Sequence, residues 1–248
     1  MNWIKACAFG AVISVVGGGS AWACDVVTAY QMRLSDAVYE MSLNGVYVEH
    51  SEEPSGASGG GPFRQWLVPG ENNLTFDLKS GAADIEVIEA CATSFDGETL
   101  VQASLSGAET RDLTFFVETP PPAIYFDLAP LKRKGLPKAV QRLQAAVEER
   151  NFKRFWRLYQ GLRMTAEANG FPMEEMKPQV RQMVKQGEIS LESDLVFTPV
   201  LGGRVWQVMT KDRKAPATLT MRQDDWTNVF ATGVFWTKVD GKWRVVGT

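Results

Sequence analysis

The chain has 248 residues, a formal net charge of −3 at pH 7 and a hydrophobic content of 45%. One histidine and three cysteines are too few for zinc sites built from clustered His and Cys. A nucleophilic triad also needs a histidine, and the chain has only one. We therefore expect no bound metal and no cofactor.

The first 23 residues have the pattern of a signal peptide. Lys5 precedes an apolar run over residues 6–16, and Ala21-Trp22-Ala23 fits the small-residue rule for cleavage before Cys24. The run is too short to span a bilayer, and no other stretch approaches the roughly 20 apolar residues that a transmembrane helix needs. We expect a periplasmic or secreted protein without a transmembrane segment in the mature chain.

Two cysteines, Cys24 and Cys91, remain after this cleavage. In an oxidising compartment they most simply form one disulfide. The alternative makes Cys24 a lipidated N-terminus, because Ala-Trp-Ala-Cys resembles a lipoprotein box in its small residues and its cysteine. The bulky Trp22 departs from that pattern. The lipoprotein remains the second hypothesis.

Charge divides the chain into two parts. Residues 24–130 carry 4 Lys and Arg against 17 Asp and Glu, whereas residues 131–248 carry 21 against 12. Either the two parts attract each other or each meets a different partner. Export argues against nucleic acid, so the basic part is expected to face an anionic membrane surface or the acidic part.

Residues 26–128 alternate between apolar and polar side chains, as half-buried strands do. Asn44-Gly45 predicts a two-residue hairpin turn and Pro69-Gly70 a type II turn. Seven or eight short strands without a helical period favour a β-sandwich over residues 24–130. The run over residues 66–74 also resembles a turn motif of small immunoglobulin-like or jelly-roll modules in exported bacterial proteins.

A basic segment bracketed by proline and glycine, residues 131–137, is typical of a linker. The apolar period then becomes helical. We expect a first helix through Val147, a second that Asn151 caps and Asn169-Gly170 ends, and a third with Pro178 in its first turn that ends at Gly187.

Strands are expected over residues 195–200, 204–210, 217–221, 229–239 and 243–246, as a curved antiparallel meander that completes an α+β domain. Asp240-Gly241 predicts a type I′ turn that pairs Lys238 with Trp243. Trp236 and Trp243 then share one face, which we expect to pack inward. The face of Phe235, Thr237 and Val239 is expected to be outer surface or an interface.

Helices with an aromatic run followed by a sheet that ends in the hairpin Phe235-Trp236-Thr-Lys-Val-Asp240-Gly241-Lys-Trp243 resemble the NTF2-like (cone) fold. The resemblance covers residues 138–248. It implies a cone-shaped cavity between helices and sheet, which in that family holds an active site, a ligand or nothing. The domain lacks the histidine found in enzymatic members.

Candidate ligand-binding residues are the aromatic and polar side chains expected at this cavity. They are Trp156, Tyr159, Arg204, Trp206, Asp225 and Trp226. Aromatic walls with a few polar groups suit a small-molecule pocket, but they also suit a plain hydrophobic core. Asp224-Asp225 could act as acid and base, or serve only as turn residues.

Three function classes remain, in this order. The first is a non-catalytic exported protein that binds other envelope proteins. The second is a carrier or sensor of a small apolar or aromatic ligand. The third is a lyase or isomerase that uses Asp225 or Tyr159.

Overall fold

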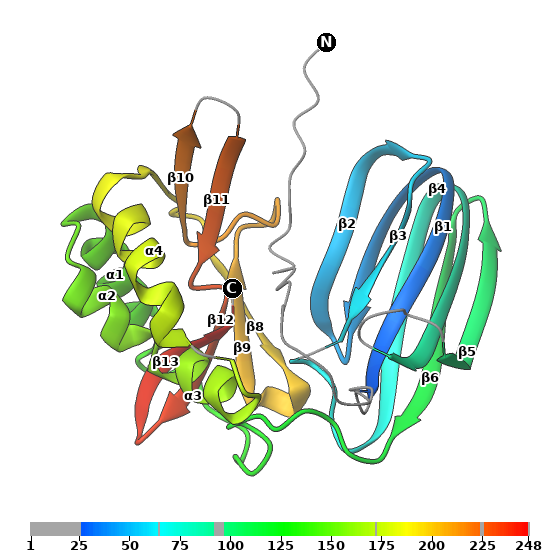
Figure 1. Cartoon of the computed structure of the whole chain (residues 1–248), viewed down its shortest axis with the longest axis horizontal. Helices are drawn as coiled ribbons and strands as arrows, with labels where there is room; N and C mark the ends of the chain where they lie inside the picture. The colour runs from blue at the N-terminus through cyan, green and yellow to red at the C-terminus, as the bar shows by residue number, and fades with distance from the viewer. Residues whose placement is uncertain (1–25, 64, 92–96, 172, 224–225, 248) are drawn as a thin grey trace, which may run out of the picture. The chain divides into compact units, whose positions relative to one another are not determined.

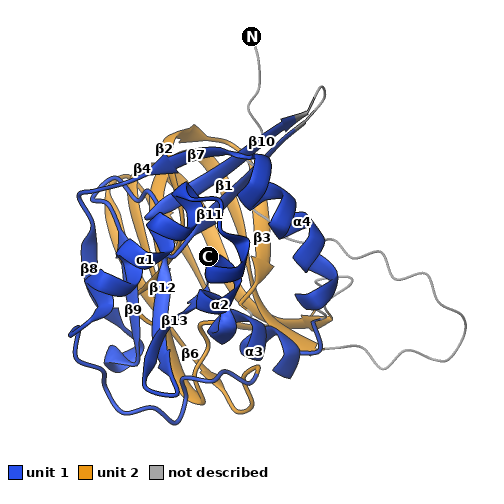
Figure 2. Cartoon of the chain, turned by 90° about the vertical axis from the view of Figure 1, so that its left-hand side faces the viewer, with its two compact units in different colours: residues 1–7, 122–248 blue, residues 8–121 orange. Residues whose placement is uncertain are grey.

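A computed structural model describes residues 26–63, 65–91, 97–171, 173–223 and 226–247. Its chain separates into two compact units, one ending at Pro121 and the other beginning at Pro122 (Figure 2). The described residues form four α-helices and thirteen strands, so the protein is mostly β with several antiparallel sheets.

The N-terminal unit is a single six-stranded antiparallel sheet (Figure 1). Its two central strands, β1 (Val26–Leu43) and β4 (Gly70–Cys91), pair along almost their whole length. β2 (Val46–Ser55) and β3 (Ser58–Pro62) pair with successive parts of β1. β5 (Gly97–Ser106) and β6 (Glu109–Val117) pair likewise with β4.

A bend, which we call the crease, crosses β1 and β4 and passes between β2 and β3 on one side and between β5 and β6 on the other. The β1–β4 register shifts between Ser35 and Tyr39, where Asp36 has a φ of 49°. Opposite it, Gly81 has a φ of 85°, and a Cβ there would lie 2.3 Å from the carbonyl oxygen of Asp36. Only glycine fits such a close backbone approach. β2 gives way to β3, and β5 to β6, beside the same line.

The sheet folds over at this crease. Tyr30 donates a 2.6 Å hydrogen bond to Glu49, which pairs with Met41 in the register. Eleven residues separate Tyr30 from Met41, about 36 Å along a straight strand, a span that two side chains cannot bridge. The sequence predicted a β-sandwich, which normally has two sheets. Here one sheet bends so that its two halves face each other, and residues of both halves form one buried cluster.

Two turns of this unit are joined by asparagine side chains. Asn44 and Gly45 have φ values of 52° and 76°, as the hairpin prediction requires, and Gly70 has a φ of 92°. Asn72, which is 1% exposed, accepts a hydrogen bond from Val68 N and donates to Val68 O. Asn44 Nδ2 donates to Asn72 Oδ1 at 2.8 Å. This buried connection between the two turns was not predicted from the sequence.

The C-terminal unit begins with helices α1 (Leu136–Glu148), α2 (Phe152–Leu158), α3 (Gln160–Ala168) and α4 (Met173–Gln186). Asn151 caps α2 as predicted, since its Oδ1 accepts from Arg154 N at 3.1 Å. The long second helix is instead broken at Tyr159. A Cβ on Gly161 would lie 2.6 Å from Val246 Cγ1, so α3 packs directly on the terminal strand. The third helix begins at Met173, which places Pro178 in its interior.

Two antiparallel sheets follow the helices, where the sequence predicted one meander. One has the order β11 (Trp226–Thr232), β10 (Ala217–Gln223), β7 (Glu188–Leu191). The other has the order β13 (Lys242–Gly247), β12 (Phe235–Val239), β9 (Val205–Met209), β8 (Val196–Val200), with a short 3-10 helix, η1 (Leu201–Gly203), between β8 and β9.

The chain passes from one sheet to the other at Gly233, whose φ is 78°. A Cβ at this glycine would lie 2.3 Å from Leu143 Cδ2 of α1. The missing side chain therefore lets α1 pack against the bend between β11 and β12.

The terminal hairpin has the predicted register. Val239 pairs with Lys242 and Lys238 with Trp243, around Asp240 and Gly241 with φ values of 50° and 72°. Trp236 and Trp243 are 0% and 7% exposed and belong to the core cluster with the α2 aromatics, as expected. The opposite face is not outer surface, because Phe235, Thr237 and Val239 are buried as well.

The basic segment over residues 131–137 belongs to the C-terminal unit. Leu131 N donates to Gly203 O at 2.8 Å, and Leu131 O accepts from Trp206 Nε1 at 3.0 Å. Trp243 Nε1 donates to Lys134 O at 3.0 Å. These bonds tie the segment to η1, β9 and β13, and the boundary between the compact units lies about ten residues earlier, between Pro121 and Pro122.

Candidate functional site

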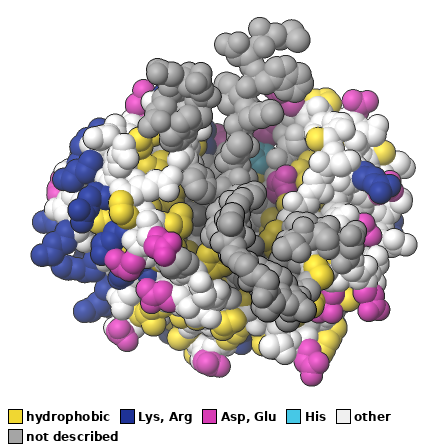
Figure 3. Space-filling model, in the orientation of Figure 1, with side chains coloured by type: hydrophobic (Ala, Val, Ile, Leu, Met, Phe, Trp, Pro, Cys, Tyr) yellow, Lys and Arg dark blue, Asp and Glu magenta, His cyan; other side chains and the backbone are white. Residues whose placement is uncertain are grey.

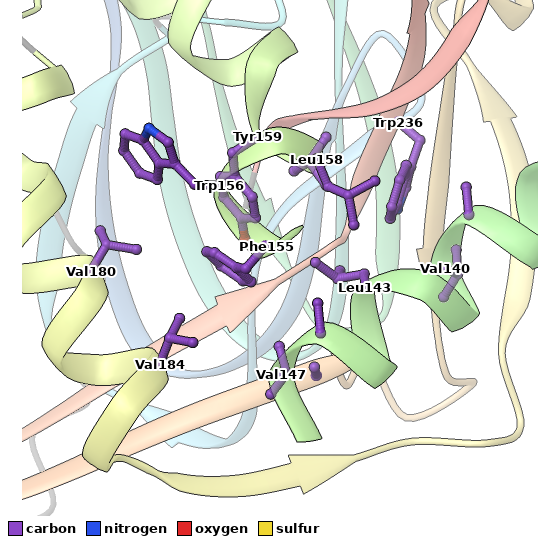
Figure 4. Packing of buried hydrophobic residues seen from close by; sticks show 14 of the residues in the cluster. Val140, Leu143, Val147, Phe155, Trp156, Leu158, Tyr159, Val180, Val184 and Trp236 are labelled. Carbon is purple, nitrogen blue, oxygen red and sulfur yellow. The ribbon is translucent and has the colours of Figure 1, made fainter. Parts of the chain in front are cut away.

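Trp156 and Tyr159, two of the candidate ligand-binding residues, lie in the hydrophobic core of the C-terminal unit (Figure 4). Their exposed fractions are 7% and 1%. Tyr159 stacks on Phe155 with ring centroids 4.5 Å apart, and Trp156 stacks on Phe152 at 5.5 Å. Burial raises the pKa of the Tyr159 hydroxyl well above its ordinary value, so this phenol stays protonated at neutral pH.

Arg204 and Trp206 hold the segment before α1. Arg204 Nε donates to Leu128 O at 3.1 Å, while Trp206 donates to Leu131 O and packs against the core cluster. The Arg204 guanidinium and the Trp206 indole N–H thus donate to backbone oxygens of their own unit. Asp225 lies outside the described residues. Trp226 begins β11, and only its backbone is described.

Lysine and arginine side chains gather over the helices of the C-terminal unit (Figure 3). On α4, Lys177, Arg181 and Lys185 recur every four residues, a spacing that aligns side chains on one helical face. Val180, Met183 and Val184 face the core from the same helix. We call the three cations the α4 stripe. This stripe was not predicted, although its four-residue spacing is visible in the sequence.

Aromatic rings of α2 position the α4 stripe. The Arg181 guanidinium carbon lies 5.0 Å from the centre of the Phe152 ring, and Lys177 Nζ lies 5.8 Å from that of Trp156. Arg163 covers the Trp156 ring at 5.3 Å. Such contacts contribute about 0.5–1 kcal/mol each at exposed sites. The stacked rings of α2 therefore hold part of the stripe in place.

The exposed carboxylate of Glu174 lies within this surface. Its hydrogen bond from Lys177, at 2.6 Å, lowers the pKa of Glu174, with a further contribution from Arg163. Lys177 is therefore partly neutralised, whereas Arg181 and Lys185 form no ion pair with a described carboxylate.

A hollow lies at one end of the stripe, between the α1–α2 turn and α4. Its volume is about 510 Å³, and it is lined by Glu149, Arg150, Asn151, Phe152, Lys153, Arg181 and Lys185. We call it the basic pocket. Four of the seven lining residues are cationic, and Glu149 is engaged by Arg154 at 2.7 Å.

A second hollow, of about 790 Å³, lies on the sheet of the N-terminal unit. Neighbouring residues of β1, β4 and β5 line it in two rows. One row is Gln31, Glu86 and Gln102, and the other is Arg33, Asp84 and Ser104. Neither hollow is lined by the predicted ligand-binding residues that the structure describes. Within the described part of the chain, no three His, Cys, Asp or Glu residues cluster as metal ligands would.

No protein-family model, curated protein or solved structure matches this chain. Among the described helices, none is long and apolar enough to cross a membrane.

Proposed function

We propose that this chain is an exported, non-catalytic binding protein of the bacterial cell envelope, and that its C-terminal unit attaches to an anionic surface. The α4 stripe carries this proposal. Residues 122–248 contain 21 basic and 13 acidic residues, and the stripe concentrates three of the cations on one helical face. Like charges repel on a helix unless an opposite charge meets them, so this face suits an anionic partner.

Export rests on the signal-peptide pattern of residues 1–23, which lie outside the described part of the chain. The resulting location is the periplasm or the exterior, with a lipid on Cys24 as the alternative to a disulfide. In such a compartment the phospholipid surface is an abundant source of negative charge.

An NTF2-like architecture for the C-terminal unit belongs to the same proposal. Its support is the order of elements, four helices followed by antiparallel strands, with the aromatic hairpin last. The space where a cone cavity is expected contains Phe155, Trp156, Tyr159 and Trp236, all at most 7% exposed (Figure 4). This packing favours binding at the surface over a ligand carrier, the second hypothesis from the sequence.

The test uses the full-length mature protein and sedimentation with lipid vesicles. We expect binding to phosphatidylglycerol vesicles, none to phosphatidylcholine vesicles, and a fall in affinity with rising salt. Replacing Lys177, Arg181 and Lys185 by glutamine should weaken binding about 100-fold, because each basic residue near an anionic surface contributes about 1 kcal/mol.

The matched control replaces three lysines of the same unit by glutamine: Lys211 and Lys214, between β9 and β10, and Lys242, the first residue of β13. The control variant loses the same net charge as the stripe variant. If the α4 stripe itself binds the vesicle, the control variant should lose much less binding. Equal losses in the two variants would reduce the effect to net charge, and no binding to any anionic vesicle would refute the membrane surface as partner.

A further inference from the structure

We infer that the basic pocket binds a phosphate group. This inference rests on the proposed function and gives the anionic partner a defined chemistry. The pocket is a hollow open to solvent, in which four cationic side chains come from two neighbouring parts of the fold. The ligand class is a phosphate ester, whose charged group meets these side chains while the rest of the molecule stays in solvent.

Arg150 forms a fixed wall of the pocket. Its guanidinium donates to three carbonyl oxygens at the end of α4: Lys185 O at 2.7 Å, Gly187 O at 3.2 Å and Val184 O at 3.4 Å. Cations are favoured at helix C-termini because of the partial negative charge there. The contact ties the α1–α2 turn to α4, which fixes the distance between the two sides of the pocket.

Arg181 is the residue best placed to bind the phosphate oxygens. Its guanidinium carbon lies 5.0 Å from the centre of the Phe152 ring, which is itself only 8% exposed. Within the described residues the guanidinium forms no ion pair, so its N–H groups are available to an oxyanion. Arginine binds phosphate through two parallel N–H donors, which adds geometric specificity to charge.

Lys153 and Lys185 add two further positive charges, one from each side of the pocket. Within the described residues, neither of them forms an ion pair, while Glu149 is engaged by Arg154. A phosphate monoester carries between one and two negative charges at neutral pH. It would therefore meet a pocket whose only acidic lining residue is already paired.

The experiment is a calorimetric titration of the full-length protein with glycerol phosphate, with sodium chloride at matched ionic strength as the blank. We expect saturable one-site binding. Arg181→Gln should weaken it at least tenfold, and Arg181→Lys should give an intermediate loss because it keeps the charge and loses the paired donors. Lys138→Gln, on the exposed side of α1, should leave the affinity unchanged.

Non-saturable heat, or equal affinity in wild type and Arg181→Gln, would overturn the inference. The source of the phosphate is decided by comparison with the vesicles. Binding of both glycerol phosphate and phosphatidylglycerol vesicles, each weakened by Arg181→Gln, identifies a lipid headgroup, whereas glycerol phosphate alone identifies a soluble ester. Stripe-dependent vesicle binding without saturable phosphate binding leaves the proposed function standing and refutes the pocket.

Discussion

The indole nitrogen of Trp243, in the last strand, donates a 3.0 Å hydrogen bond to the carbonyl oxygen of Lys134, 109 residues earlier in the chain. The same indole is 7% exposed and packs in the core of the C-terminal unit. Lys238 covers its ring, with Nζ 5.5 Å from the ring centre. One side chain thus joins the start of this unit to its end.

Replacing Trp243 by alanine should lower the free energy of unfolding by about 3–5 kcal/mol, the usual cost of removing a large buried aromatic side chain. Trp243→Phe keeps most of the apolar contact and loses the hydrogen bond, so it should cost less, with about 1 kcal/mol from the lost bond. Urea unfolding followed by circular dichroism gives both values. An alanine variant as stable as wild type would contradict the core role of Trp243.

The segment over residues 131–137 should resist trypsin. The sequence predicted a linker here, but the backbone of this segment, which contains the trypsin sites Lys132, Arg133 and Lys134, is bonded to Gly203, Trp206 and Trp243. A protease needs a locally unfolded chain, so cleavage here should follow global unfolding and accelerate with urea. Rapid cleavage at these sites in native conditions would restore the linker.

A steric contact between Gly233 and Leu143 offers a double-mutant test. Gly233→Ala should destabilise the protein by about 1–3 kcal/mol, because alanine must adopt a φ of 78° and its Cβ meets Leu143 Cδ2. Leu143→Ala alone should cost about 2–5 kcal/mol. In the double variant the clash is gone, so the combined loss should be smaller than the sum. Strict additivity would exclude the contact.

Stability should fall at alkaline pH. Burial, together with Glu49, raises the pKa of both Tyr30 and Tyr39 above the ordinary value of 10.0. Below pH 10 both phenols are neutral in the folded and the unfolded chain, so their contribution is fully present. Above pH 10 only the unfolded chain releases these protons, and each phenol lowers the free energy of unfolding by about 1.4 kcal/mol per pH unit.

Tyr39→Phe should remove one of these contributions. Its free energy of unfolding, measured in urea, should fall by about 1 kcal/mol less than that of wild type between pH 10 and pH 11. The value at pH 7 gives the baseline for the lost hydrogen bond to Glu49, which is 3.0 Å long. Parallel pH profiles would mean that Tyr39 ionises equally easily in both states.

The disulfide between Cys24 and Cys91 remains a prediction, because Cys24 lies outside the described residues. The register places Val26 opposite Cys91, two residues from Cys24. A bridge would close a loop of some 67 residues and stabilise the fold by about 4 kcal/mol. Mass spectrometry of the exported protein without reduction should show the loss of two hydrogens. Two titratable thiols, or a diacylglycerol mass on Cys24, would reject the bridge.

Local chemistry was predictable from the sequence. Asn44-Gly45 and Asp240-Gly241 form their turns, and Asn151 caps α2, because each depends on a few neighbouring residues. Contacts between distant residues were not predictable. The crease at Gly81 and the break in the helix at Tyr159 both depend on close packing against residues far away in the sequence.

The candidate site shows the same limit. Burial of Trp156 and Tyr159 was one of two readings left open by the sequence, and only the packing places both in the core. The four-residue spacing of the α4 stripe was visible in the sequence. Its position over Phe152 and Trp156 was not, because that depends on how α4 crosses α2.

The pairing of β1 with β4 also dictates an order of assembly. The paired residues Leu43 and Leu74 are 31 positions apart in the sequence, whereas Val26 and Cys91 are 65 positions apart. Closing the shorter loop costs less entropy, and every later pair then extends an existing ladder. We therefore expect strand pairing to begin near the joined turns at Asn44 and Asn72 and to proceed toward Val26. Val26, at the N-terminal end of β1, is then expected to be the last residue of this strand to pair.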